Sequence, residues 1–155
     1  NIIQTLVFSA DDCTLFSTSH DQTLCRWDLA TGTRQASWST QHTAYWALAI
    51  HPDGRCIASG GGDHLIRLLD SESGEIEREW QGHTHIVESL SFRADGQLLA
   101  SASQDETIRL WDTGSGACLQ VLRTPGPYAG MNIRGVTGLS PAQKAALMAL
   151  GAMEE

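Results

Sequence analysis

Short segments of alternating apolar and polar residues recur along the first four fifths of the chain. The clearest of them cover residues 4–8, 46–50 and 88–92. Alternation with a period of two over this length predicts strands that bury one face. A polar turn follows each segment, and the second and third turns contain Asp-Gly. This pair supplies the positive φ that tight hairpins need, so each segment is predicted to be the first strand of a hairpin.

Three further strands are predicted after each of these segments. The second and third strands of the three units fall at residues 14–19 and 23–27, 56–60 and 65–69, and 98–103 and 107–111. The fourth strand ends at Trp38, Trp80 or Leu122. Four short strands separated by turn residues are typical of one blade of a β-propeller.

The units repeat with a period of 42 residues, as the turn residues Asp21, Asp63 and Asp105 show. Other sets with the same spacing are Ser17, Ser59 and Ser101; Asp28, Asp70 and Asp112; and Gly32, Gly74 and Gly116. A fixed period of this length indicates a repeat architecture. We predict three units at about 1–39, 40–81 and 82–122, and we expect most of the recurrent polar residues to serve the scaffold.

The pattern changes in residues 123–155. Residues 123–139 are rich in proline and glycine, which predicts an irregular connection. A helix is predicted at about 140–150, because Ser140, Pro141 and Gln143 form the sequence signature of a capping box. An isolated helix this short is marginal in water, so its apolar residues are expected to dock on the repeats or on a neighbouring domain.

Composition excludes several classes of partner. The formal net charge of the 155-residue chain is −8, which argues against nucleic acid, and no apolar run is long enough to span a membrane. No secretory signal is present, and we predict a cytoplasmic protein. The first residue is Asn1 rather than methionine, so we expect a piece of a longer chain. The four cysteines, Cys13, Cys25, Cys56 and Cys118, form no CxxC pair and are predicted to be reduced structural thiols.

The repeats resemble the WD40-repeat family. The resemblance rests on Trp27-Asp28, Trp111-Asp112, Gly82-His83 and the recurrent aspartate before the third strand, and it covers residues 1–122. It implies an all-β fold in which three four-stranded WD40 blades form part of a β-propeller, with a short C-terminal helix. The tail is similar to extensions that follow the last blade in bacterial, notably cyanobacterial, multidomain WD40 proteins, where the propeller often sits behind a signalling NTPase domain.

The resemblance also implies a hydrogen-bonded network of His, Ser or Thr, Asp and Trp in each blade. Unit three has all four residues: His83, Ser101, Asp105 and Trp111. Unit one has Ser17, Asp21 and Trp27, and its histidine position precedes the chain. Unit two has Ser59 and Asp63, but Leu69 replaces the tryptophan, and Gln41 takes the histidine position with His42 one place out of register. Blade two is therefore expected to be less tightly held.

Two chemical alternatives are weighed against this structural role. His83, Ser101 and Asp105 could form a nucleophile, base and acid, but serine and aspartate recur in every unit whereas a catalytic set is needed once. His83 and His85 could face the same way on a strand and bind a metal, but no third ligand has suitable spacing. We therefore predict no enzyme activity, no metal and no cofactor. Arg67 and Arg109, at equivalent third-strand positions, are expected on a solvated strand face.

A partner-binding rim is implied by the resemblance at the start of the innermost strands. Trp46, Glu88 and Gln4 occupy this position, and His20 and Gln104 precede the turn aspartates. Tryptophan is enriched in binding hot spots, so an exposed Trp46 would be an anchor. The alternative, a Trp46 packed between blades, stays open.

These observations favour a non-enzymatic scaffold that presents its rim to a protein or peptide, as the C-terminal propeller portion of a larger bacterial signalling protein. A closed propeller typically has about 4–8 blades. Three blades therefore call for further blades from the same parent chain or from another copy. The alternatives are a ligand-binding or enzymatic propeller that uses the central channel, and a structural unit that completes a ring by oligomerisation.

Overall fold

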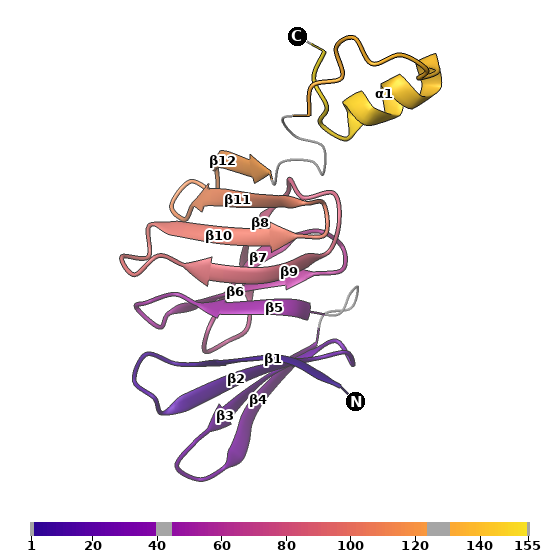
Figure 1. Cartoon of the computed structure of the whole chain (residues 1–155). Helices are drawn as coiled ribbons and strands as arrows, with labels where there is room; N and C mark the ends of the chain where they lie inside the picture. Colours follow the sequence, from indigo (N-terminus) through magenta and orange to yellow (C-terminus); the bar gives the residue numbers. More distant parts are fainter. Residues whose placement is uncertain (1, 40–44, 124–130, 155) are drawn as a thin grey trace. The chain divides into compact units, whose positions relative to one another are not determined.

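The computed structural model describes residues 2–39, 45–123 and 131–154. In these residues twelve strands form three four-stranded antiparallel sheets, and one helix follows (Figure 1). The predicted all-β fold of three blades with a short C-terminal helix is confirmed. The strands are β1 (Ile3–Phe8), β2 (Thr14–Ser19), β3 (Thr23–Asp28), β4 (Thr33–Ser39), β5 (Tyr45–Ile50), β6 (Cys56–Gly61), β7 (Ile66–Asp70), β8 (Ile76–Trp80), β9 (Val87–Phe92), β10 (Leu98–Ser103), β11 (Thr107–Asp112) and β12 (Cys118–Arg123).

Each blade follows the chain from its innermost to its outermost strand. Blade one is β1 to β4, blade two is β5 to β8 and blade three is β9 to β12. The register repeats as well as the topology: Ser17 lies opposite Leu6 and Cys25, Ser59 opposite Leu48 and Arg67, and Ser101 opposite Leu90 and Arg109. The 42-residue period of the sequence is therefore also the period of the structure.

The recurrent aspartate that ends the third strand closes the turn to the fourth. In blade one, Asp28 accepts a hydrogen bond from the backbone N–H of Thr31 at 2.8 Å. Asp70 and Asp112 accept the equivalent bonds from Ser73 and Ser115. These bonds lower the pKa of all three carboxyl groups, as expected for carboxylates that accept backbone N–H groups. The tight turn also needs a residue of positive φ, which the recurrent glycine supplies.

The blades pack face to face through two apolar clusters. Phe16 and Leu24 of blade one meet Leu48 and Ile57 of blade two. A larger cluster joins blades two and three: Ala47, Ala49, Ala58, Ile66, Leu68, Trp80, Val87, Leu90, Leu99 and Trp111. Each pair of neighbours is thus held by side chains that alternate along the inner strands.

In blades one and two, a tryptophan near the end of the outer strand packs on a turn glycine of the next blade. Trp38 of blade one lies against Gly74 of blade two, and Trp80 of blade two lies against Gly116 of blade three. A Cβ atom at either glycine would overlap the indole ring. The glycine is therefore required twice, for its positive φ and for this close approach.

Residues 123–155 form a second compact unit. Helix α1 (Pro141–Ala149) begins with the predicted capping box, in which Ser140 and Gln143 exchange hydrogen bonds. Ile133 and Ala152 are buried, and the backbone N–H of Ile133 donates to the carbonyl of Met153 at 2.9 Å. Docking of the helix on another surface stays a prediction. No helix of the described residues is long and apolar enough to cross a membrane.

The four cysteines carry free thiols and differ in environment. Cys25 is buried and Cys56 is half-buried, whereas Cys13 and Cys118 are exposed. Burial, with the nearby carboxylates of Asp53, Glu77 and Asp70, raises the pKa of the Cys56 thiol to about 11. A structural role thus fits Cys25 and Cys56 better than the two exposed residues.

Candidate functional site

Four polar side chains of blade three form a continuous hydrogen-bonded network. His83 Nδ1 lies 2.8 Å from Asp105 Oδ2, and His83 Nε2 lies 2.6 Å from Ser101 Oγ. The indole Nε1 of Trp111 donates to the same Ser101 Oγ at 2.8 Å. Thr107 joins the network, since its hydroxyl donates to Asp105 Oδ1 at 2.5 Å. The network links β10, β11, the turn between them and the segment before β9.

Trp111 fixes the direction of these hydrogen bonds. An indole N–H can only donate, so Ser101 Oγ accepts from it. The serine hydroxyl then donates to His83 Nε2, which leaves the proton of the neutral imidazole on Nδ1, facing Asp105. Every member has a partner, which offsets the cost of burying polar groups.

The charge state follows from burial and hydrogen bonding. Burial lowers the pKa of His83 and outweighs the opposite effect of the Asp105 hydrogen bond. Burial alone would raise the pKa of Asp105, but hydrogen bonds from Thr107, His83 and the Thr84 backbone hold it well below its usual range. At neutral pH the pair is therefore a neutral imidazole beside a carboxylate.

Stability is accordingly expected to fall as the pH drops below about 6.5, the unperturbed pKa of histidine. In this range His83 binds a proton in the unfolded state but not in the folded state, where its pKa is lowered. The free energy of unfolding therefore decreases by at most about 1.4 kcal/mol per pH unit for this group. Below about pH 4, Asp105 adds a loss of the same sign. Urea titrations between pH 4 and 8 measure the effect. The His83→Gln variant should lose stability at pH 7 and show a shallower dependence, and an unchanged slope would contradict the assignment.

The order serine, histidine, aspartate in this network resembles a hydrolytic triad, but the surroundings differ. Ser101 and Trp111 are almost completely buried, and the hydroxyl of Ser101 already bonds to both His83 and Trp111. A nucleophile must reach its substrate, and this hydroxyl has no accessible side. The geometry therefore supports a structural role for the network.

Blade one contains part of the same network. Trp27 Nε1 donates to Ser17 Oγ at 2.8 Å, as Trp111 does to Ser101. Asp21 accepts from the backbone N–H and the hydroxyl of Thr23, at 3.1 and 2.5 Å. These contacts are the blade-one equivalents of those that Asp105 makes with Thr107.

Blade two holds its aspartate in a different way. Arg67 donates from Nη2 to Asp63 Oδ2 at 2.5 Å and from Nε to Glu79 Oε1 at 2.7 Å. The side chain of Arg67 is buried, so the expectation of a solvated position is wrong for this residue, and Arg109 is only half-buried. With Leu69 in place of tryptophan, the buried Ser59 Oγ has no hydrogen-bond partner among the described residues. Gln41 and His42 lie outside the described residues.

Four of the five candidate rim residues form two contact pairs. Trp46 of blade two is half-buried, and its ring meets His20 of blade one edge to face, with ring centroids 4.9 Å apart. In blade three, Gln104 Nε2 donates to Glu88 Oε1 at 2.7 Å. Gln4 is half-buried at the equivalent position in blade one. Trp46 thus combines the two alternatives: it touches the neighbouring blade and keeps part of its surface accessible.

His85 does not share a site with His83. His83 is buried in the network, whereas His85 is exposed and lies edge to face with His64 of blade two, at 5.9 Å between ring centroids. Both His83 and His85 precede β9 rather than lying on it. Within the described residues, no group of three His, Cys, Asp or Glu side chains could hold a metal ion.

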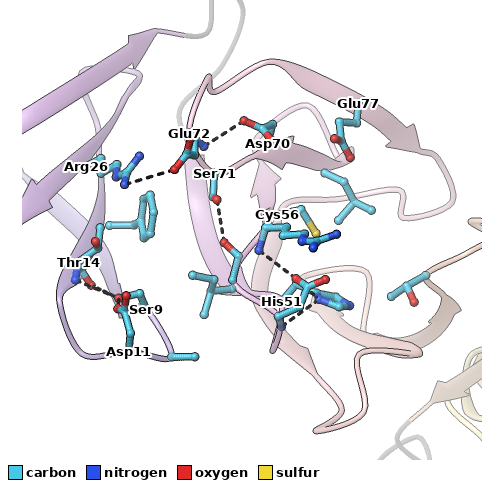
Figure 2. Close-up of a pocket in the computed structure, with 18 of the residues that line it drawn as sticks. Ser9, Asp11, Thr14, Arg26, His51, Cys56, Asp70, Ser71, Glu72 and Glu77 are labelled. Atoms are coloured by element: carbon cyan, nitrogen blue, oxygen red, sulfur yellow. Dashed lines mark hydrogen bonds and ion pairs between the residues drawn. The ribbon is translucent and has the colours of Figure 1, made fainter.

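A cleft of about 750 Å³ lies on the other edge of the blades, beside the turns that follow β1 and β5 (Figure 2). Arg26 of blade one and Glu72 of blade two face each other across it at 4.0 Å. On the blade-two side, His51 Nδ1 contacts Asp53 Oδ1 at 2.7 Å. Sequence reasoning missed this cleft because its charged residues come from different blades and meet only where two blades lie side by side. None of the five rim residues lines it.

Comparison with known proteins agrees with the repeats seen in the structure. The WD domain, G-beta repeat, matches residues 1–28, 32–70 and 74–112, which are more than half of the chain. The chain belongs to the WD40 family. Solved WD40 structures similar to it include those of U3-55K and of the RRP9 WD40 repeats. Each is 25% identical, has a TM-score of 0.75, and matches 79% of this chain and 39% of its own.

Curated relatives of this WD40 chain include subunit I of eukaryotic translation initiation factor 3. The Coccidioides immitis protein is 34% identical over 68 residues, and the Neurospora crassa protein is 32% identical over 69 residues. Each match covers 44% of this chain and 20% of the relative, so the chain spans about a fifth of the length of these relatives. Both relatives are fungal, and the bacterial resemblance of the tail stays a prediction.

Proposed function

We propose that this WD40 chain is a non-enzymatic scaffold that binds a protein or peptide at the rim formed by Gln4, His20, Trp46, Glu88 and Gln104. WD40 propellers are generally scaffolds, and the relatives named above are by name subunits of an initiation factor, which supports a protein partner. The net charge of −8 disfavours nucleic acid and anionic membranes as partners. The observation that carries the proposal is Trp46, held in place by His20 with part of its surface accessible.

A tryptophan that is already ordered before binding loses little conformational entropy when a partner packs on it. Hot-spot tryptophans contribute about 2 kcal/mol or more, which corresponds to roughly 30-fold in affinity. We therefore expect peptides selected on the wild-type chain from a random display library to bind Trp46→Ala at least about 30-fold more weakly. Calorimetry or fluorescence anisotropy measures the change.

Gln4→Ala is the matched control, because Gln4 occupies the same strand position in blade one without an aromatic ring. It should change the same affinities by less than about threefold. Selected peptides that bind a folded Trp46→Ala variant as tightly as the wild type would exclude Trp46 as the anchor.

We also propose that these blades and the tail form the C-terminal propeller portion of a larger bacterial signalling protein in the cytoplasm. The support is the resemblance of the tail to extensions in bacterial multidomain WD40 proteins. The coding sequence upstream of Asn1 tests it: further units with the 42-residue period and a signalling domain would agree with the proposal, and a eukaryotic gene structure would contradict it.

A further inference from the structure

An arginine lies between blades one and two at a position where the other two blades have leucine. Arg26 of β3 is the equivalent of Leu68 in β7 and Leu110 in β11, one and two repeat periods further along the chain. Arg26 faces blade two, where its nearest charged neighbour is Glu72. Leu68 is buried in the packing between blades two and three. In blade one a charged side chain therefore takes the place of an apolar packing residue.

The guanidinium group of Arg26 lacks acceptors for its five N–H donors. Its Nε–H is buried and has no hydrogen-bond partner within the described residues. Its Nη2 lies 4.0 Å from Glu72 Oε1, which is too far for a hydrogen bond. By contrast, Arg67 donates to Asp63 and Glu79 at 2.5 and 2.7 Å. Because three quarters of the Arg26 side chain is buried, an acceptor supplied by a ligand would offset the cost of its missing hydrogen bonds.

Arg26 lines the cleft of about 750 Å³ between the blades (Figure 2). The residues that form the cleft all lie between Ser9 and Gly114, so both of its walls belong to the three blades. Binding sites for small ligands commonly have volumes of about 300–1,000 Å³. Within the described residues, the side chains of Arg26 and Arg55 form no hydrogen bond, and Arg55 is exposed. Arg26 is therefore the partly buried donor that a ligand can satisfy.

The charges along the cleft determine which anion is favoured at Arg26. Five carboxylates and three guanidinium groups of the described residues line it: Asp11, Asp53, Asp70, Glu72 and Glu77, and Arg26, Arg55 and Arg78. This excess of negative charge repels a doubly charged phosphate more strongly than a singly charged carboxylate. A carboxylate also matches the planar guanidinium group with two parallel hydrogen bonds. The anion expected at Arg26 is therefore a carboxylate.

The acidic side of the cleft favours a cation beside that carboxylate. The three aspartates each accept a hydrogen bond from a backbone N–H of their own turn. Glu77 forms no hydrogen bond or ion pair within the described residues, and Glu72 has only its distant contact with Arg26. A ligand that carries a basic group next to its carboxylate would thus place opposite charges on Arg26 and on Glu72.

We propose that this cleft is a second binding site, which takes a peptide segment of a protein partner with an acidic side chain beside a basic one. Arg26 binds the carboxylate of the segment, and Glu72 binds its cationic group. The rim residues do not line the cleft, so a partner bound here leaves Trp46 accessible. The proposal therefore goes beyond the function proposed for the rim and does not depend on it.

Titration of the full chain with an N-acetylated, C-amidated Glu-Lys dipeptide tests the site. The Nε–H signal of Arg26 in nuclear magnetic resonance spectra, identified by its loss in Arg26→Leu, should move along a saturable curve. Replacing the glutamate of the dipeptide by glutamine should weaken binding at least tenfold, because a hydrogen-bonded charge is lost. Arg26→Lys should weaken binding by about the same factor, since lysine keeps the charge but not the two parallel hydrogen bonds.

Two further variants separate binding from folding. Arg55→Gln is the matched control, because Arg55 is an exposed arginine of the same cleft, and it should change the affinity less than about threefold. Arg26→Leu introduces the residue of the other two blades and removes an unpaired, partly buried charge. It should abolish dipeptide binding and unfold at a urea concentration no lower than the wild type does. A clearly lower urea midpoint would show that Arg26 holds the blades together and would overturn the proposal.

Acetate and inorganic phosphate, titrated at the same ionic strength, identify the class of ligand. Acetate should bind at least about tenfold more weakly than the dipeptide, and phosphate no more tightly than acetate. Acetate that binds as tightly as the dipeptide would assign the cleft to small carboxylates, and tighter binding of phosphate would assign it to phosphate groups. Either result, or an Arg26 signal that does not saturate, would overturn the proposal. Trp46→Ala should leave the dipeptide affinity unchanged, so this site and the rim are tested independently.

Discussion

Replacement of Ser101 by alanine should lower the free energy of unfolding by about 2–4 kcal/mol, whereas the same replacement at Ser59 should change it by less than about 0.5 kcal/mol. Both hydroxyls are buried at the same position of their blades. Ser101 Oγ bonds to His83 and Trp111, so its loss leaves a buried indole N–H and a buried imidazole nitrogen without partners. Ser59 Oγ has no partner among the described residues, and its removal also removes an unsatisfied buried group.

Ser17→Ala completes the series, with an expected loss of about 1 kcal/mol, because within the described residues the Ser17 hydroxyl bonds to the indole of Trp27 and not to a histidine as well. Urea unfolding monitored by tryptophan fluorescence and by circular dichroism measures the three variants under one condition. We expect the loss of unfolding free energy to be largest for Ser101→Ala, smaller for Ser17→Ala and smallest for Ser59→Ala. Equal losses of unfolding free energy at Ser101 and Ser59 would show that the hydroxyls act through packing alone and that the hydrogen-bonded network does not stabilise the fold.

The strands and turns could be predicted from the sequence because their signals are local and occur three times. Alternation indicates each first strand, and the recurrent glycine and aspartate indicate each turn. The predicted strand ends therefore differ from the observed ends by no more than one residue. The capping residues Ser140 and Gln143 located the helix in the same way. Such signals need only neighbours along the chain.

The contacts between strands and between blades could be predicted less completely. The loss of the Trp partner at Leu69 is visible in the sequence, but the burial of Arg67 is not. An arginine on a strand is usually solvated, and its burial here depends on Asp63 in the turn and Glu79 on the next strand. The pairing of His20 with Trp46 also joins two blades, and so does the charged cleft at Arg26 and Glu72. The family pattern predicts the strands and turns within one blade, whereas these features depend on contacts between residues that are distant along the chain.

Substitutions at the recurrent turn glycine distinguish two contributions to stability: the packing between blades and the backbone strain within a blade. Gly74→Ala and Gly116→Ala should each cost about 2–5 kcal/mol of unfolding free energy, whereas Gly32→Ala should cost about 1–2 kcal/mol. All three positions have a positive φ, which an alanine adopts only with strain. At Gly74 and Gly116 the new methyl group also overlaps Trp38 or Trp80, and the overlap must push the neighbouring blade away. At Gly32 no atom of the described residues lies within 4 Å of where the new methyl group would be.

Urea unfolding of the three glycine variants under one condition gives the ranking. If Gly32→Ala costs as much as Gly74→Ala, the close approach of tryptophan contributes nothing and the penalty is that of the turn alone. A smaller cost at Gly32 would show that the packing of Trp38 and Trp80 adds to the strain of the turn at Gly74 and Gly116.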